Sequence, residues 1–164
     1  MDFYSEGLTM IKVEWRQEFE VGYERIDFEH RIFLGLICDA SVALELGLDH
    51  QRILRHLEEI KHYALFHFIS EENIMLDIDY PGLESQKNEH QILLAQLDDK
   101  IHQYRNEVMD LATIVEFLFE WFALHTTQAD TRLGRYIRSS QSRAAFPFPP
   151  ETLGLPLNES VKTG

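Results

Sequence analysis

Residues 60–76 have the sequence IKHYALFHFISEENIML. His67 and Glu71 lie four positions apart in this stretch, which on an α-helix places them on one face, about 6 Å apart along the axis. Tyr63 and Met75 continue this face at the same spacing, so the face is predicted to point into a core. An ionised glutamate in a core needs a strong partner. A metal ion is one such partner, because histidine with carboxylate is a common ligand combination for iron.

The same pair has a simpler interpretation, in which His67 is a hydrogen-bonded core histidine and Glu71 lies at the edge of the core. Histidines and carboxylates elsewhere in the chain decide between the two interpretations, because a metal ion needs ligands from several segments.

The composition is that of one globular domain with a sizeable core, since the chain has 164 residues of which 45% are hydrophobic. A formal net charge of −13 argues against a surface that binds nucleic acid or an anionic membrane. The single cysteine, Cys38, cannot form an internal disulfide and so favours a reducing compartment. No run approaches the roughly 18 apolar residues of a membrane span, and the first residues do not resemble a secretory signal. We therefore expect a cytoplasmic protein.

Apolar residues recur at helical spacing from Ile26 onward. Asp27 is predicted to cap a first helix that Gly47 ends, and Asp49 to open a second helix that runs to about Leu76. The sequence Asp77-Ile78-Asp79-Tyr80-Pro81-Gly82 is typical of a turn. A third helix is predicted over about 84–106, and Asp110 is predicted to cap a fourth.

Four amphipathic helices with short connections and no convincing strand predict an all-α, up-down-up-down four-helix bundle. We expect an extended N-terminal arm over residues 1–21, the bundle over 22–139 and an irregular tail over 140–164. Four of the five prolines fall in this tail, and proline disfavours a continuous helix. The tail is predicted either to pack irregularly through Phe146 and Phe148 or to link the bundle to a further domain.

Each predicted helix carries a histidine that can face the core: His30, His67, His90 and His125. Any one of them alone is consistent with an ordinary core histidine. Four histidines on four helices, with a carboxylate one turn from one of them, favour a metal site, and helix bundles build such sites from facing side chains.

These residues also carry a family resemblance, which covers residues 15 to about 137. The chain resembles bacterial hemerythrins, oxygen-binding proteins with a non-haem di-iron centre. The matching residues are Trp15, Val21-Gly22, Ile26-Asp27-Phe28-Glu29-His30, Tyr63, His67-Phe68, Glu71-Glu72, Met75, Tyr80-Pro81-Gly82, His90, Trp121, His125, Asp130 and Arg132-Leu133-Gly134.

The resemblance implies two iron ions with an oxo, hydroxo or water bridge. It assigns His30 and His67 to one iron and His90 and His125 to the other. It further implies that Glu71 and Asp130 bridge the two irons.

The assignment of Asp130 has a structural consequence. Asp130 lies five residues after His125, and five residues on an ideal α-helix correspond to a rotation of about 140° away from it. Periodicity alone would select Ala129 as the neighbour of His125. If Asp130 is a bridge, the helix must loosen between these residues or contain a π-type turn, a feature that is frequent at functional sites.

Gln86 is a departure from the family pattern, which has a further histidine one turn before His90. An amide oxygen is a weaker ligand for iron than imidazole. We therefore expect two histidines per iron, with the remaining position filled by water, filled by Gln86 or left empty. Gln86 hydrogen-bonded to a bound water is the alternative. Trp121 is expected beside the site, in an apolar surround with Phe33, Phe68, Met75 and Phe122 that is also compatible with ordinary core packing.

Other candidate ligands are discounted by their positions. His50, His62 and His102 fall off the ligand faces and are expected to be exposed. His56 shares the face of His67 but lies about 16 Å along the axis. Glu72 is rotated by about 100° from Glu71 and is expected at the surface or beside a cation.

The leading hypothesis is that the chain binds dioxygen at the di-iron centre and is not an enzyme. The resemblance implies oxygen storage, or oxygen and redox sensing with a fused or separate signalling domain reached through the C-terminal tail. The first alternative is a di-iron enzyme that reduces oxygen or peroxide. The second is a degenerate site in a bundle that serves only as an interaction module.

Overall fold

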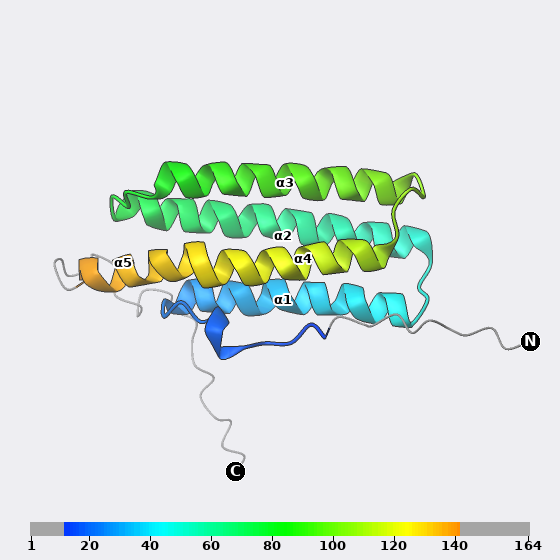
Figure 1. The fold of residues 1–164 in the computed structure, drawn as a ribbon, viewed down its shortest axis with the longest axis horizontal. Helices are drawn as coiled ribbons and strands as arrows, with labels where there is room; N and C mark the ends of the chain where they lie inside the picture. The colour runs from blue at the N-terminus through cyan, green and yellow to red at the C-terminus, as the bar shows by residue number, and fades with distance from the viewer. Residues whose placement is uncertain (1–11, 142–164) are drawn as a thin grey trace, which may run out of the picture.

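The structure is a computed structural model that describes residues 12–141. Four antiparallel helices form a bundle: α1 (Glu24–Glu45), α2 (His50–Asp77), α3 (Leu83–Arg105) and α4 (Leu111–His125). Helix pairs α1–α2, α2–α3, α3–α4 and α1–α4 are in contact, and the connections are short (Figure 1). This arrangement confirms the predicted up-down-up-down bundle.

Two features extend the bundle at its ends. A short 3₁₀-helix, η1 (Gln17–Phe19), precedes α1, and the side chain of Phe19 is fully buried. Helix α4 continues through a π-helix, η2 (Thr126–Asp130), into α5 (Thr131–Gln141), so that α4, η2 and α5 run along one line (Figure 1). Phe146, Phe148 and the tail prolines lie outside the described residues, and the three-part division of the chain stays a prediction.

Two of the predicted helix caps are confirmed. The backbone N–H of Arg52 donates to the Asp49 carboxylate at 2.9 Å, and the N–H of Thr113 donates to that of Asp110 at 2.8 Å. Each bond satisfies an amide that the first turn of a helix leaves without an internal partner.

The predicted cap at Asp27 is wrong. Helix α1 begins at Glu24, one turn earlier, after Tyr23. The Asp27 carboxylate instead accepts hydrogen bonds from the N–H groups of Val21 (2.7 Å) and Gly22 (3.2 Å). A carboxylate near the start of a helix can accept hydrogen bonds either from the segment before the helix or from the first helical turn. The spacing of residues in the sequence does not distinguish these two roles.

Gly47 ends α1 as predicted. Its φ of +60° is in the left-handed region. The N–H of Leu48 donates to the Ala43 carbonyl and that of Gly47 to the Leu44 carbonyl, both at 3.2 Å. This pair of bonds is a Schellman motif, in which glycine is preferred because it has no Cβ.

Glu107 occupies the corresponding position after α3, with a φ of +59°. The N–H of Val108 donates to the Gln103 carbonyl there, as in the glycine-ended motif. Glu107→Gly is expected to raise the free energy of unfolding by about 0.5–1 kcal/mol, because it removes the strain of an L-residue in the left-handed region. The greater flexibility of glycine in the unfolded chain offsets only part of this gain.

The matched control for this prediction is Gly47→Glu. A Cβ at Gly47 would meet nothing within 4 Å, so this variant tests the backbone conformation alone and should lower stability by a similar amount. Urea unfolding of both variants measures the effect. Equal stability of Glu107→Gly and the parent would contradict the prediction.

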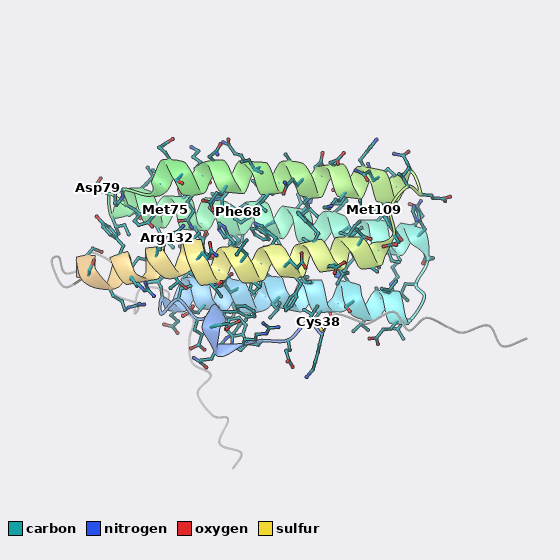
Figure 2. All side chains as sticks on the ribbon, in the orientation of Figure 1. Cys38, Phe68, Met75, Asp79, Met109 and Arg132 are labelled. Atoms are coloured by element: carbon teal, nitrogen blue, oxygen red, sulfur yellow. The ribbon has the colours of Figure 1, made fainter. Side chains whose placement is uncertain are left out.

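The apolar interior has two parts. The larger cluster fills most of the bundle, and the smaller one lies near α5 and consists of Val21, Ile26, Ile74, Met75, Leu133 and Ile137. Along α1, His30 follows Ile26 of the smaller cluster and precedes Phe33 of the larger. Polar residues are therefore buried where the two clusters meet. Phe68 belongs to the larger cluster and Met75 to the smaller one, and Figure 2 shows Met75 nearer than Phe68 to Asp79 at one end of the bundle.

Candidate metal centre

All six residues predicted to hold metal are buried where the two apolar clusters meet. They come from α1 (His30), α2 (His67 and Glu71), α3 (His90), the end of α4 (His125) and η2 (Asp130). Their nitrogen and oxygen atoms form two groups able to hold a cation, the first from His30, His67, Glu71 and Asp130, the second from Glu71, His90 and His125.

Each carboxylate offers one oxygen to each histidine pair. On one side, Glu71 Oε1 lies 3.5 Å from His67 Nε2, and Asp130 Oδ2 lies 3.3 Å from His30 Nε2. On the other side, Glu71 Oε2 lies 3.3 Å from His90 Nε2, and Asp130 Oδ1 lies 3.2 Å from His125 Nε2. This is the arrangement expected of two carboxylates that bridge two neighbouring ions.

The π-helix η2 explains how Asp130 reaches the centre. In a π-helix the hydrogen bonds run from residue i to residue i+5, so a residue five positions after His125 returns to the same face. The Thr131 hydroxyl also donates to the Thr126 carbonyl at 3.0 Å, across this widened turn. The predicted π-type turn is therefore confirmed, and Asp130 is fully buried.

The polar atoms at the centre are not satisfied by the protein alone. Within the described part of the chain, His30 Nε2, Glu71 Oε1 and Asp130 Oδ2 are buried without a hydrogen-bond partner. His90 Nε2 and His125 Nε2 lie 3.2 Å apart, a separation suited either to one shared N–H or to two lone pairs on a common ion. Buried polar atoms without partners are costly, so this donor set fits metal binding.

The outer nitrogen of each imidazole faces an oxygen outside the centre. The Nδ1 atoms lie 3.3 Å from the Phe19 carbonyl for His30, 2.9 Å from Glu29 for His67, 3.0 Å from Glu72 for His90 and 3.6 Å from Glu89 for His125. An acceptor at Nδ1 favours the tautomer with its proton there, which leaves the Nε2 lone pair directed at the metal.

Glu29 is a functional candidate that sequence reasoning missed. Its carboxylate contacts His67 and accepts hydrogen bonds from the Ser70 hydroxyl (2.7 Å) and from Arg25 Nε (3.1 Å). Burial opposes ionisation, but the hydrogen bonds from His67 and Ser70 prevail and lower the pKa of Glu29. The sequence shows only that Glu29 directly precedes His30. Its contact with His67 on α2 depends on which faces α1 and α2 turn toward each other.

The expectation for Glu72 is wrong. Its carboxylate contacts His90 and is partly buried. The rotation of about 100° that separates it from Glu71 directs it toward α3, which packs against α2. Glu72 therefore orients a histidine of the centre and is not simply a surface group.

The two central carboxylates have opposite pKa shifts. Burial, reinforced by the negative charge of Asp130, raises the pKa of Glu71 well above its usual value. Burial would also raise the pKa of Asp130, but His125 and His30 outweigh it and hold that pKa far below the ordinary range. Without a metal the centre favours one proton on Glu71 and a charged Asp130, since adjacent buried carboxylates resist double ionisation.

The pKa values of the four histidines also shift in opposite directions. Burial lowers the pKa of His67 to about 4 despite its hydrogen bond to Glu29, and burial also lowers the pKa of His90. Burial opposes the charged forms of His30 and His125 as well, but their contacts with Asp130 raise both pKa values. Asp130 is thus the main counter-charge at the metal-free centre.

Aromatic rings enclose the imidazoles as expected. Phe68 stacks on His90 with ring centroids 4.1 Å apart, and Trp121 stacks on His125 at 5.2 Å. Phe122 meets the His30 ring edge-on at 5.6 Å. These rings restrict access of water and keep the local dielectric low, which strengthens every electrostatic contact at the centre.

Gln86 reaches the centre as well. It lies one turn before His90, is 4% exposed, and its Nε2 atom lies 2.8 Å from Asp130 Oδ1 and 3.5 Å from Glu71 Oε2. Its side chain therefore occupies the level of the ligands, on the side of the His90–His125 pair.

The discounted histidines lie away from this cluster. His62 and His102 are exposed as expected, whereas His50 is half-buried and stacks on Tyr104 with ring centroids 4.7 Å apart. His56 Nε2 lies 3.0 Å from the Leu36 carbonyl, in a contact between α2 and α1.

Removing the negative charge beside Nδ1 should weaken the binding of the two ions separately, because a neutral amide holds and polarises an imidazole less strongly than a carboxylate does. We expect Glu29→Gln to weaken metal binding at the His30–His67 pair by about 10–100-fold, and Glu72→Gln to do the same at the His90–His125 pair, the usual effect of losing a group that orients a ligand. Stepwise zinc titration by calorimetry distinguishes the two ions.

Glu59→Gln is the matched control, because Glu59 makes the same kind of contact with His56 (3.3 Å) away from the centre. It should leave both steps of the titration unchanged. A loss of the same step in Glu29→Gln and Glu72→Gln would contradict the division into two pairs.

Comparison with known proteins places this geometry in a family. Residues 21–137 match the family described as the hemerythrin HHE cation binding domain. A bacteriohemerythrin of Clostridium acetobutylicum is 28% identical over 125 residues, which cover 71% of this chain and 94% of that protein. A bacteriohemerythrin of Pseudomonas aeruginosa is 27% identical over 90 residues, 55% of this chain and 58% of that protein.

A bacteriohemerythrin of Stenotrophomonas maltophilia is 23% identical over 88 residues, 54% of this chain and 57% of that protein.

In residues 12–141, no helix combines the length and apolar character needed to cross a membrane. The matched segment begins between η1 and α1, ends in α5 and includes all six residues of the centre. The chain therefore belongs to the hemerythrin family, whose four-helix domain binds oxygen at a di-iron centre.

Proposed function

We propose that this chain binds dioxygen at a di-iron centre in which His30 and His67 hold one iron and His90 and His125 the other. Glu71 and Asp130 are the bridges in this proposal. The observation that supports it most strongly is that each carboxylate directs one oxygen toward each histidine pair.

The residues around the centre support this function in distinct ways. When bound, the ion pair supplies two electrons for reaction with dioxygen. The carboxylates keep the two binding positions close together, and the acceptors at Nδ1 keep each imidazole directed inward. Phe68, Trp121 and Phe122 limit the access of water to the oxidised or reduced site.

Within this chemistry we favour oxygen or redox sensing over carriage, with storage as the second use. Gln86 stands where the family pattern has a further histidine, and a site with fewer protein ligands responds more readily to solvent and small molecules. A fused or separate signalling domain would be reached through the C-terminal tail, residues 140–164. The single cysteine, Cys38, fits the reducing cytoplasm, where we place the protein.

The test is an optical spectrum of iron-loaded protein, reduced without oxygen and then exposed to it. We expect a new absorption band on exposure that disappears when oxygen is removed, with no continuing oxygen consumption. Steady consumption of oxygen or peroxide in the presence of a reductant would favour the alternative of a di-iron enzyme. Protein that holds no iron after expression with iron supplied would contradict both.

A further inference from the structure

The side-chain amide of Gln86 is buried against the two central carboxylates. The Nε2 atom has its short contact with Asp130 Oδ1 and a longer one with Glu71 Oε2. An amide nitrogen donates N–H groups and has no lone pair available for a metal, whereas the amide oxygen is an acceptor. The amide oxygen in this place would face the charged Asp130 carboxylate, which repels it, so the nitrogen is the atom that faces Asp130.

The protein ligands available to the neighbouring ion are then few. The His90–His125 pair supplies two imidazoles, and Glu71 and Asp130 supply one oxygen each. The His30–His67 pair has the same set. Iron sites with two histidines and carboxylates characteristically keep positions open for exogenous ligands.

Of the four histidines at the centre, His125 borders a surface groove, whereas His90 does not line it. A groove of about 320 Å³ lies between α3 and the α4–η2 segment. Its lining residues are Glu89, Ile92, Leu93, Trp121, Leu124, His125, Gln128, Ala129 and Arg132. Neither His30 nor His67 lines this groove. Arg132 adds a positive charge to a groove whose other polar lining residues are Glu89, His125 and Gln128, and Figure 2 shows Arg132 on the α5 side of the bundle, near Met75.

We propose that Gln86 is a positioning residue that does not bind metal, and that the ion held by His90 and His125 keeps a position open to a small diatomic or anionic ligand. The ligand reaches this position through the groove between α3 and α4–η2. Gln86 holds the shared carboxylates by N–H donation and does not fill the ligand position at this ion, so both ions of the pair can accept an external ligand. This inference rests on the di-iron centre proposed above.

Nitric oxide is a suitable probe because it is diatomic and binds ferrous iron wherever a position is open. The experiment titrates reduced protein, shown by iron analysis to carry both ions, and counts nitric oxide bound per ion pair by infrared N–O stretching bands and absorbance. We expect two molecules per pair, with two distinct bands, in the parent. We expect one molecule and the loss of one band in Gln86→His, because the new imidazole fills the open position.

Gln86→Leu keeps the test decisive if the histidine variant does not fold. It removes the amide without adding a ligand, and we expect two molecules per pair, as in the parent. One molecule in the parent and two in Gln86→Leu would show that Gln86 ligates iron and would overturn the proposal. Two molecules in both the parent and Gln86→His would also overturn it, because position 86 would then not lie at the open position.

The route of entry has its own test. Leu124 is exposed and lines the groove, so Leu124→Trp should slow the binding of the second nitric oxide several-fold without changing the number bound. Leu65→Trp is the matched control, because Leu65 is an exposed leucine on α2 that does not line this groove. Equal association rates in the two variants would contradict entry through the groove.

The two proposals fail in different ways. Protein without iron would remove the di-iron centre and, with it, the role of Gln86. A single nitric oxide per fully loaded pair would leave oxygen binding intact and reject only the open position at the His90–His125 ion.

Discussion

Glu71→Gln is expected to abolish paired metal binding while making the metal-free protein more stable. Glu71, in the C-terminal part of α2, offers one oxygen to each histidine pair. An amide cannot bridge two ions as a carboxylate does, so we expect the affinity for the second ion to fall by more than about 100-fold, beyond the effect of losing an orienting group. Metal analysis after dialysis measures this loss.

The gain in stability of the metal-free variant follows from the raised pKa of Glu71. In the unfolded state the Glu71 carboxyl has its ordinary pKa of 4.5 and releases its proton above that pH, whereas in the folded state it keeps the proton. The free energy of unfolding therefore falls as the pH rises above 4.5. Glutamine does not titrate and lacks this penalty. At neutral pH we expect the variant to be more stable by about 1–3 kcal/mol, and the difference should shrink as pH falls toward 4.5.

Asp130→Asn is the contrasting control. The folded pKa of Asp130 is lowered below 3.8, so its charge contributes stability above that pH, and this contribution is lost as pH falls toward the folded value. This variant should also lose paired metal, but its metal-free form should be less stable than the parent at neutral pH. Urea unfolding of chelator-treated protein measures both variants. A change of the same sign in the two would contradict the opposite shifts.

Moving the second carboxylate back by one residue is expected to eliminate the paired site. In the double variant Ala129→Asp with Asp130→Ala, the carboxylate occupies the position that an α-helix would direct toward His125. Because η2 is a π-helix, that position faces the groove between α3 and α4, and we expect at most one tightly bound ion. Zinc titration with circular dichroism to verify folding measures the outcome.

Ala129→Asn with Asp130 retained is the control for crowding at position 129, and it should still bind two ions. If the double variant bound two ions as tightly as the parent, the helix would have α-helical register at the centre, and the assignment of Asp130 would fail.

The four helices were predictable because their signals are local. Apolar spacing, the carboxylates of Asp49 and Asp110 and the left-handed Gly47 each act within one turn of the chain. Asp27 shows the limit of such signals, since its carboxylate holds the segment before the helix and does not cap the helix start.

The centre was predictable only in part from physical reasoning. Spacing on α2 selected His67 and Glu71, and the histidines on the other helices supported them, but Asp130 was identified by family resemblance against the periodicity of an α-helix. Glu29 and Glu72 were missed or misplaced because their role depends on which face α2 turns toward α1 and α3. That rotation arises from packing of whole helices, and no local pattern encodes it.

The central claim is that Glu71 and Asp130 hold two irons side by side. X-ray absorption at the iron edge of fully loaded protein tests it most directly, because iron–iron scattering reports the separation of the ions. We expect two irons per chain with scattering at a separation below about 4 Å, as in other paired metal sites, and its loss in Glu71→Gln. Iron-loaded protein without iron–iron scattering, or scattering unchanged in Glu71→Gln, would contradict the claim.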